Sequence, residues 1–494
     1  MAQEARQIQQ QETVIGVDKA GVDSLRKDAM SNFSVLYIAL AGAAPIAAMM
    51  FNVPLMAGQA GASTPLAFVL SGLGMVAFAF VIMWFARRYS AAGGFYNYVS
   101  HALPRPVAFQ AGWMMLGGYA VTEAALMSAF GAFSATAIEH YMGFKVPWLV
   151  LALVGAGILY LVSYSDVSWS VWAMVPFLIL EVAVLLILDV VITAKGGAAG
   201  HDLVSTFTTA GAGLKGASPG GLVGIALAMA LGIQTWIGFE GGAVYGEEAK
   251  DPRKAIPFAL FGSVLFLLVL YAWTSYNAVI GFGAEHAVDI LAANPDNAFY
   301  MLADQYLPIL RPFMTIAITT SALACGLAFH NGMVRYFYAM GREGILPKRF
   351  GKTHPKFKSP YVAIMAQSTL TVAVLLVFGG LLAVEPMPLY GYLAVTGAIS
   401  LICVYILVNV AAMRQRDRSV AGNLWNHVLV PAFATLLILM PMVSFFYPVP
   451  AWPLNILPYI VVAWIIIGAV IASIVATKYP DRWEILGKIA RQED

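Results

Sequence analysis

Long apolar segments separated by short polar ones dominate the pattern of residues along the chain. A helix that crosses a bilayer needs about 20 mostly apolar residues, and twelve such segments occur. They begin near Phe33, Thr64, Val107, Val146, Val171, Leu222, Phe258, Pro312, Val362, Leu389, His427 and Ile456, and the last ends near Thr477. A transmembrane β-barrel would show shorter segments of alternating polarity. The pattern therefore predicts an all-α integral membrane protein with twelve transmembrane helices.

The positions of Lys and Arg predict how these helices are oriented, because cytoplasmic loops carry an excess of positive charge. With the amino terminus inside, 24 of the 28 Lys and Arg residues fall on the cytoplasmic side. The four on the other side are Lys145, Lys195, Lys215 and Arg311. We therefore expect a multi-pass protein of the cytoplasmic (plasma) membrane, with both termini in the cytoplasm and no soluble domain in any loop.

The amino-acid composition agrees with a membrane protein and argues against nucleic acid as a partner. Hydrophobic residues make up 60% and charged residues 11% of the 494 residues, against roughly 45–50% and about 25% in soluble domains. The net charge of +2 gives no basic excess for nucleic acid. The two cysteines, Cys325 and Cys403, lie in apolar segments and are expected to be packing residues. We expect no cofactor and no metal site.

Two of the predicted helices are interrupted in a way that the others are not. The first contains Pro45 among small residues, in the stretch ALAGAAPIAAMMFNVP (39–54), and the sixth contains four glycines, in LGIQTWIGFEGG (231–242). Proline removes a backbone donor and glycine weakens a helix. Because the two breaks lie five helices apart, they indicate an inverted-repeat transporter whose binding site lies at the breaks. The other interpretation is that these residues only allow close helix packing.

Three loop segments carry a resemblance to a known family. They are RRYSAAGGFYNYVSHALPRP (87–106), GFEGGAVYGEEAKDPRKAIP (238–257) and RYFYAMGREGILPKRFGKTHPKFKSP (335–360). At these helix boundaries, they resemble the AGG-x-Y-x-Y, GFE…EE-x-K-(N/D)-P and RDG-x-LP segments of the amino acid–polyamine–organocation permeases. The resemblance covers about residues 30–412 in detail.

This resemblance implies a fold of five plus five helices in inverted repeats, followed by helices 11 and 12. The expected units are an amino tail (1–32), a first repeat (33–192), an extracellular loop (193–221), a second repeat (222–413), helices 11 and 12 with the loop before them (414–477) and a carboxyl tail (478–494). Both tails are expected to be cytoplasmic.

The resemblance also implies that an amino acid or amine is held where helices 1 and 6 unwind. Free N–H groups at one broken end suit a carboxylate, and free carbonyl groups at the other suit an ammonium group. The predicted binding residues are Ala44, Pro45, Ile46, Ala47, Ala48, Met49, Thr122, Gln234, Thr235, Trp236, Ile237 and Gly238. The segment Ile46–Met49 stands where many relatives have a Gly-Ser-Gly-like break. Amines without a carboxylate are therefore expected to compete with amino acids.

Glu181, in the middle of the fifth helix, is the first candidate for proton coupling. Proton-coupled relatives commonly have a lysine near this point, beside the site that holds sodium in sodium-coupled relatives. Hydrocarbon disfavours an ionised carboxylate, so the group can change protonation when water reaches it. A structural hydrogen bond is the alternative role. The stretch Ala322–Phe329 in helix 8 has no Ser or Thr, and a hard cation needs several oxygen ligands. Proton coupling, or exchange without an ion, is favoured over sodium.

Six other polar residues have a structural or a functional interpretation. Glu123 is a second candidate for proton coupling, or a helix-packing group, and His330 is a packing residue or a proton relay. Glu240 is expected to anchor the unwound part of helix 6 by accepting hydrogen bonds from free N–H groups. Arg335, Arg342 and Glu343 are either determinants of orientation or contacts of a cytoplasmic gate with the loop after helix 2.

The sequence thus predicts a secondary transporter for an amino acid or a related amine, working by alternating access and driven by protons. An ion-independent exchanger and a channel-like facilitator are the alternatives. No ring of charges or filter-like run supports a channel. No HExxH, GxSxG, Walker or paired Cys/His motif supports an enzyme. The expected partners are the small substrate, the proton and the lipid bilayer.

Overall fold

The structure is a computed structural model of the 494-residue chain. It describes residues 31–89, 94–165, 167–214, 216–218, 220–240, 249–294, 297–415, 424–444, 446–447, 449 and 452–486. Most of the two predicted tails (1–32 and 478–494) lies outside these residues. So do parts of the segments after the second and sixth predicted helices, at 90–93 and 241–248.

The described part of the chain folds into helices and contains no β-strand. The long helices are α2 (Asn32–Ala43), α3 (Pro45–Ala60), α4 (Thr64–Ala86), α6 (Arg105–Met142), α7 (Trp148–Tyr164), α8 (Val167–Lys195), α10 (Gly221–Gln234), α11 (Pro252–Phe282), α14 (Leu310–Arg342), α15 (Tyr361–Val374), α16 (Pro386–Arg414), α17 (Val430–Ser444) and α18 (Leu457–Lys478). The short ones are α5 (Gly94–Ala102), α9 (Leu203–Phe207), α12 (Ala284–Ala293), α13 (Ala298–Tyr306) and α19 (Pro480–Ile485). Two π-helical turns, Leu375–Leu381 and Trp425–Leu429, continue α15 and precede α17.

Nine stretches of the described chain are long and apolar enough to cross a membrane. The first, Asn32–Ala86, is 55 residues long and contains α2, α3 and α4. Two further apolar helices, α7 and α10, are shorter. The predicted all-helical membrane architecture is confirmed, whereas the count of twelve crossings stays a prediction.

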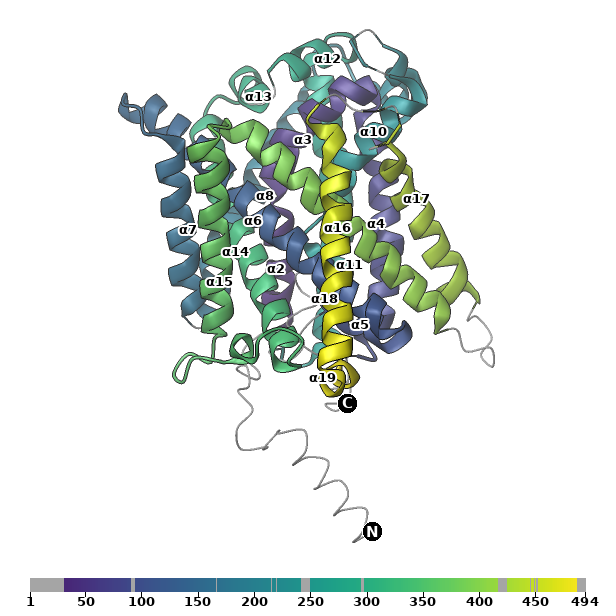
Figure 1. The fold of residues 1–494 in the computed structure, drawn as a ribbon. Coiled ribbons are helices and arrows are strands. Elements are labelled where there is room, and N and C mark those ends of the chain that lie inside the picture. The colour runs from purple at the N-terminus through teal and green to yellow at the C-terminus, as the bar shows by residue number, and fades with distance from the viewer. Residues whose placement is uncertain are drawn as a thin grey trace, which may run out of the picture.

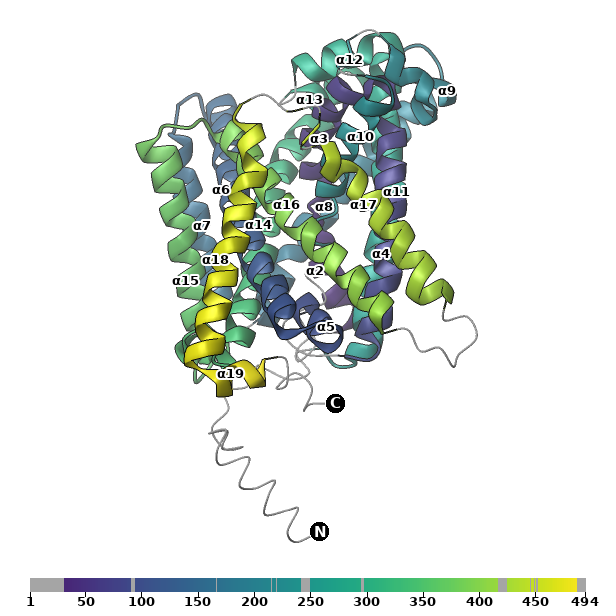
Figure 2. The same cartoon turned by 45° about the vertical axis from the view of Figure 1, so that its right-hand side comes forward.

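The long helices stand side by side in one bundle, and short helices cover its two ends (Figure 1). Helices α2 and α3 are largely buried, and α14 packs against both α6 and α8. Helices α17 and α18 lie at the periphery, as the turned view shows (Figure 2). Helices α12 and α13 cover one end, whereas α5 and α19 lie at the other (Figures 1 and 2). The interrupted helices are therefore enclosed by the rest of the bundle.

The first break lies between α2 and α3, at the proline that predicted it. Ala44 separates the two helices with left-handed backbone angles, φ 46° and ψ 68°, and Pro45 is the first residue of α3. Proline disfavours the α conformation in the residue before it and is well suited to the first helical position. A non-glycine residue in the left-handed region costs about 1–3 kcal/mol and persists only where its surroundings hold it. The neighbouring helices must therefore hold Ala44 in this conformation.

The second break begins where α10 ends at Gln234. Residues 235–238 continue as turns, and Gly238 has a φ of +113°, which favours glycine. Here the two breaks touch through their backbones. A Cβ atom built on Gly42 would overlap the carbonyl oxygen of Gly238, and a Cβ atom on Gly238 would overlap that of Gly42. The sequence places these glycines 196 positions apart, and only the fold reveals that each makes room for the other.

A substitution at Gly42 tests this contact. We expect Gly42→Ala to lower the thermal unfolding midpoint of the detergent-solubilised protein, because the added methyl group overpacks the junction, at a typical cost of about 1–3 kcal/mol. Gly157→Ala in α7 is the matched control, since nothing lies within 4 Å of its added Cβ. The control should be neutral or stabilising. Equal midpoints for the two variants would contradict the predicted contact.

Candidate functional site

A cavity of about 50 Å³ lies where the two interrupted helices meet. Seven of the twelve residues predicted to bind substrate line it: Ala44, Ala47, Ala48, Thr122, Gln234, Thr235 and Ile237. They come from three segments, namely α3 with the residue before it, the middle of α6, and the end of α10 with the turn after it. The structure therefore brings together parts of the chain that the sequence analysis linked only through the two breaks and the family resemblance.

The other five predicted binding residues do not line the cavity. They are Pro45, Ile46, Met49, Trp236 and Gly238. Ile46 and Met49 are fully buried on other sides of α3. Trp236 is also fully buried, and its ring lies 5.0 Å from that of Tyr271 and 6.3 Å from that of Phe68. The indole thus packs toward α4 and α11 and does not line the cavity.

Several lining residues were not anticipated from the sequence. Asn52, Cys325, Phe329 and Tyr390 line the cavity and come from α3, α14 and α16. The side-chain amide of Asn52 donates a hydrogen bond to the Ala48 carbonyl oxygen (3.0 Å). The thiol of Cys325 donates one to the Gly42 carbonyl oxygen (2.9 Å). Asn52 lies within the interrupted stretch 39–54 but was not singled out there. Cys325, Phe329 and Tyr390 lie on α14 and α16, which the sequence did not connect with the breaks.

The side chains around the cavity are uncharged. Its polar groups are amides, hydroxyls and one thiol, together with the backbone of the two breaks. The first N–H groups of α3 have no partner within the helix, and the same holds for the last carbonyl groups of α2 and α10. The cavity therefore lies beside the positive end of one helix dipole and the negative ends of two others.

The hydroxyl of Tyr271 joins the two breaks. It lies 3.2 Å from the carbonyl oxygen of Ala43 and 3.3 Å from that of Thr235. Since a hydroxyl has one hydrogen to donate, it can bond to one of these carbonyls at a time. Tyr271 is fully buried on α11. Its hydroxyl donates a hydrogen bond to a carbonyl group that, in a continuous helix, would accept one from a backbone N–H.

Glu181 lies behind the first break. One of its carboxylate oxygens accepts a hydrogen bond from the Ser321 hydroxyl (2.7 Å) and lies 3.4 Å from the Ile46 backbone nitrogen. The other oxygen has no hydrogen-bond partner among the described residues. The side chain is fully buried on α8. A buried carboxyl group thus touches the first turn of α3 from the side away from the cavity.

Ser321 was missed because it lies one residue before the stretch 322–329, in which the sequence analysis found no hydroxyl. The structure therefore adds one hydroxyl of α14 to the surroundings of Glu181. Within the described chain, no group of three or more His, Cys, Asp and Glu residues is placed to hold a metal ion.

Glu123 faces away from the cavity, although the adjacent Thr122 lines it. Its carboxylate lies 3.1 Å from His330 Nδ1 and accepts hydrogen bonds from Thr371 (2.8 Å) and from the amide of Gln367. All of these side chains are buried. The cluster joins α6, α14 and α15, and this geometry suits a packing role.

Glu240 lies at the second break. It accepts a hydrogen bond from the Gly238 backbone N–H (2.9 Å) and another from the Tyr119 hydroxyl (3.1 Å). The carboxylate thus binds a backbone donor freed by the break and connects it to α6. Both carboxyl groups nearest the breaks, Glu181 and Glu240, contact main-chain N–H groups.

The predicted gate residues lie at the end of the bundle that carries α5. The hydroxyl of Tyr96, on α5, donates a hydrogen bond to the Glu343 carboxylate. Arg335 donates one to the Asn331 carbonyl oxygen (2.8 Å), and the Arg342 guanidinium lies 5.3 Å from the Tyr338 ring centre. The segment after α4 and the end of α14 are therefore in contact.

Comparisons with known proteins assign the chain to a family. A family model described as "Amino acid permease" matches residues 31–472. The low-affinity putrescine importer PlaP of Escherichia coli K12 is 29% identical, over 56% of this chain and 59% of that protein. The branched-chain amino acid permease BcaP of Bacillus subtilis is 26% identical, over 53% and 52%. The methylthioribose transporter of Bacillus subtilis is 24% identical, over 61% and 64%.

These alignments span about half to two thirds of the length of the curated relatives. The family model is broader and covers most of the chain, including both breaks and all of the candidate site. It confirms the resemblance drawn from the three loop segments, and its description is that of a transporter family and not of an enzyme family. The chain is a multi-pass membrane protein that belongs to the amino acid permease family.

Proposed function

We propose that this protein is a secondary active transporter that moves an amino acid, or a closely related amine, across the cytoplasmic membrane by alternating access. One observation carries the proposal. Two helices unwind at the same place, touch through Gly42 and Gly238, and leave a small cavity beside their free backbone groups. Helix breaks of this kind bind the charged ends of small substrates in transporters.

The proposed architecture has twelve crossings. Counting the 55-residue stretch Asn32–Ala86 as two crossings, and adding the shorter apolar helices α7 and α10 to the other eight stretches, gives this number. The two breaks then lie in crossings 1 and 6, five positions apart, as an inverted repeat of five helices requires. The proposed repeats are residues 33–192 and 222–413. The positions of the Lys and Arg residues support a cytoplasmic location for both termini.

The chemistry of the cavity favours a substrate with one ammonium group. The cavity offers backbone amides at α3 for a carboxylate and backbone carbonyls near Thr235 for an ammonium group. No charged side chain lines it, so a second positive charge would find no carboxylate there. The known relatives differ in this respect, since one is named for a diamine and another for branched-chain amino acids.

The cavity is too small for an amino acid as it stands. A volume of about 50 Å³ is well below the roughly 300–1,000 Å³ of pockets for drug-sized ligands. It exceeds the roughly 10–15 Å³ that one water molecule needs. Substrate entry therefore requires the helices around the breaks to move apart, as alternating access does.

Proton coupling is proposed to depend on Glu181. Its carboxyl group touches the first turn of α3 through Ile46, so movement of α3 changes the surroundings of that group. Burial disfavours the charged form of a carboxyl group, and access of water favours it. Opening of the bundle would therefore let Glu181 release a proton. The alternative is an exchanger that needs no ion, in which Glu181 only holds α3 in place.

Thermal unfolding of the purified protein with a panel of amino acids, their decarboxylated amines and putrescine tests the substrate class. Binding to the native state raises the unfolding midpoint. We expect stabilisation by one or more compounds with a single ammonium group and none by putrescine. Stabilisation by putrescine alone would contradict the proposed substrate class.

Ala47→Leu tests the location of the site. A branched side chain would fill the cavity and cover the amides of α3, so we expect the stabilising compound to lose at least tenfold in affinity. Ala432→Leu, the same change on an exposed position of α17, serves as the control and should bind normally. Normal affinity in a folded Ala47→Leu protein would place the site elsewhere.

Glu181→Gln tests the coupling role, because the amide is nearly isosteric and stays neutral. In liposomes, we expect this variant to lose accumulation of substrate driven by an imposed pH gradient and to keep substrate exchange. Asp189→Asn is a matched control. Asp189 is also buried on α8, but it accepts a hydrogen bond from Thr274 (2.5 Å) and not from a residue of either break. Accumulation at the wild-type level by Glu181→Gln would leave Glu181 a structural role only.

A further inference from the structure

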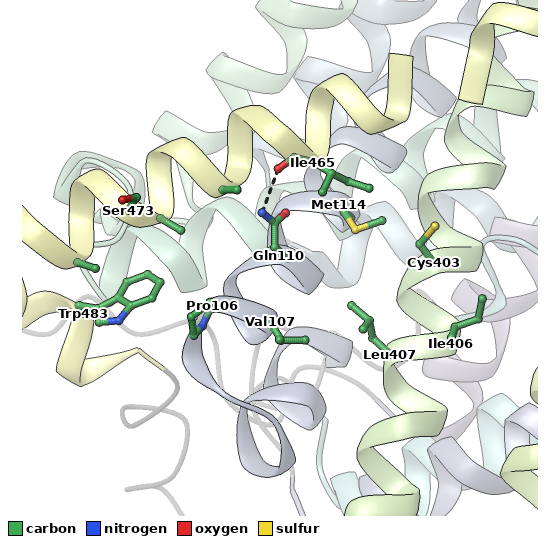
Figure 3. Close-up of a pocket in the computed structure, with 13 residues that line it drawn as sticks. Pro106, Val107, Gln110, Met114, Cys403, Ile406, Leu407, Ile465, Ser473 and Trp483 are labelled. Carbon is green, nitrogen blue, oxygen red and sulfur yellow. Dashed lines mark hydrogen bonds between the residues drawn. The ribbon is translucent and has the colours of Figure 1, made fainter. Parts of the chain in front are cut away.

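A second cavity, of about 670 Å³, opens on the outer side of the bundle. It is a groove between α6, α16 and α18, and Trp483 of α19 closes one end of it (Figure 3). Its walls are almost entirely apolar, with Gln110 and Ser473 as the polar exceptions. No residue of this groove belongs to the substrate cavity.

The groove exists because α18 is held against α6 by one set of contacts, and the part of α18 that follows these contacts has small side chains facing α6. Trp113 and Trp464 stack with ring centres 4.2 Å apart, and each indole N–H donates to the other residue's carbonyl oxygen (2.9 and 3.0 Å). The Gln110 amide adds a hydrogen bond to the Ile465 carbonyl oxygen (3.0 Å; Figure 3). After these contacts, the residues of α18 that line the groove are small: Ala469, Ala472, Ser473 and Ala476.

The length of the groove matches one leaflet of a bilayer. Its lining residues on α18 run from Ile465 to Ala476, which is about 16 Å at 1.5 Å per residue. The hydrocarbon core of a bilayer is about 30 Å thick, so one leaflet accounts for about half of that. The groove ends at Trp483, and Trp is the residue type favoured at the membrane interface.

Basic residues stand at this end of the groove. Arg105 and Lys478 are exposed beside the lining residues Pro106 and Ala476, and Arg482 precedes Trp483. Asp481 and Glu484 lie on the same short helix, so these five residues carry one net positive charge. Within the described chain, neither Arg105 nor Lys478 forms an ion pair. Positive charges near a membrane surface attract anionic headgroups.

We propose that this groove is a binding site for an anionic phospholipid. One acyl chain lies along α18 against the small residues, and the phosphate group lies near Arg105 and Lys478. An empty groove in a membrane would lose the dispersion contacts that an acyl chain supplies. Basic charge at the mouth and a length of one leaflet both fit a lipid, and neither feature is required by a second copy of the chain.

Native mass spectrometry of delipidated protein in detergent tests the proposal. The probes are dioleoylphosphatidylglycerol and dioleoylphosphatidylethanolamine, which share acyl chains and differ in net charge. We expect one lipid per chain, with the glycerol lipid bound about fivefold more tightly, as one net charge near a surface provides. Arg105→Gln combined with Lys478→Gln should remove this preference and keep lipid binding. Equal affinity for the two lipids in the wild type would overturn the headgroup assignment.

Substitutions that fill the groove test its place. Ala469 and Ser473 are exposed, so Ala469→Phe and Ser473→Phe can be accommodated in the fold, and each should weaken lipid binding at least tenfold. Ile467→Phe and Ile474→Phe are the controls, since both positions are exposed on α18 but do not line the groove. They should bind as the wild type does. Unchanged binding in both groove variants would overturn the proposal. A dimer of the wild-type protein in the mass spectra that is lost in both groove variants would also overturn the proposal, because it would show that a second copy of the chain occupies the groove.

Discussion

The fold around the candidate site depends on one backbone contact, between Gly42 in the first interrupted helix and Gly238 in the second. Any side chain at either position would overlap the other's carbonyl group, so the two breaks can meet only where both residues are glycine. This contact brings the end of α2 and the turn after α10 together. Because helix ends expose unpaired backbone groups, the same contact concentrates such groups in the middle of an apolar bundle.

Three buried side chains satisfy part of that exposed backbone: Tyr271 comes from α11, Glu181 comes from α8, and Glu240 directly follows the second break. The Tyr271 hydroxyl donates a hydrogen bond to the carbonyl oxygen of either Ala43 or Thr235. The Glu240 carboxylate accepts a hydrogen bond from the Gly238 N–H. The Glu181 carboxylate lies 3.4 Å from the Ile46 backbone nitrogen. In a membrane, irregular backbone is tolerated only where it is buried in protein or lines a cavity. The remaining groups face a cavity with uncharged walls. The proposed substrate, a small zwitterion, would complete the hydrogen bonding of the two breaks.

The fold was largely predictable from the sequence, and the site only in part. Apolar segments identified the helices, and Pro45 placed the first break to within one residue, because proline acts locally. Trp236 was predicted to bind substrate, yet it does not line the cavity and packs against Tyr271. No rule of sequence fixes which way a side chain points once a helix has unwound. Cys325 and Tyr390 were missed because they reach the cavity from unbroken helices, where only the packing of the bundle brings them close.

The cysteines of the chain allow the central claim to be measured directly. Cys325 lines the proposed substrate cavity, and Cys403 lies in the outer groove. In Cys403→Ser protein in membranes, Cys325 is the only thiol, so its rate of alkylation by N-ethylmaleimide reports how often the cavity opens. We expect slow but measurable alkylation without substrate, and a rate at least tenfold lower with a saturating concentration of the compound that stabilises the protein. Equal rates with and without that compound would contradict a substrate site at the two helix breaks.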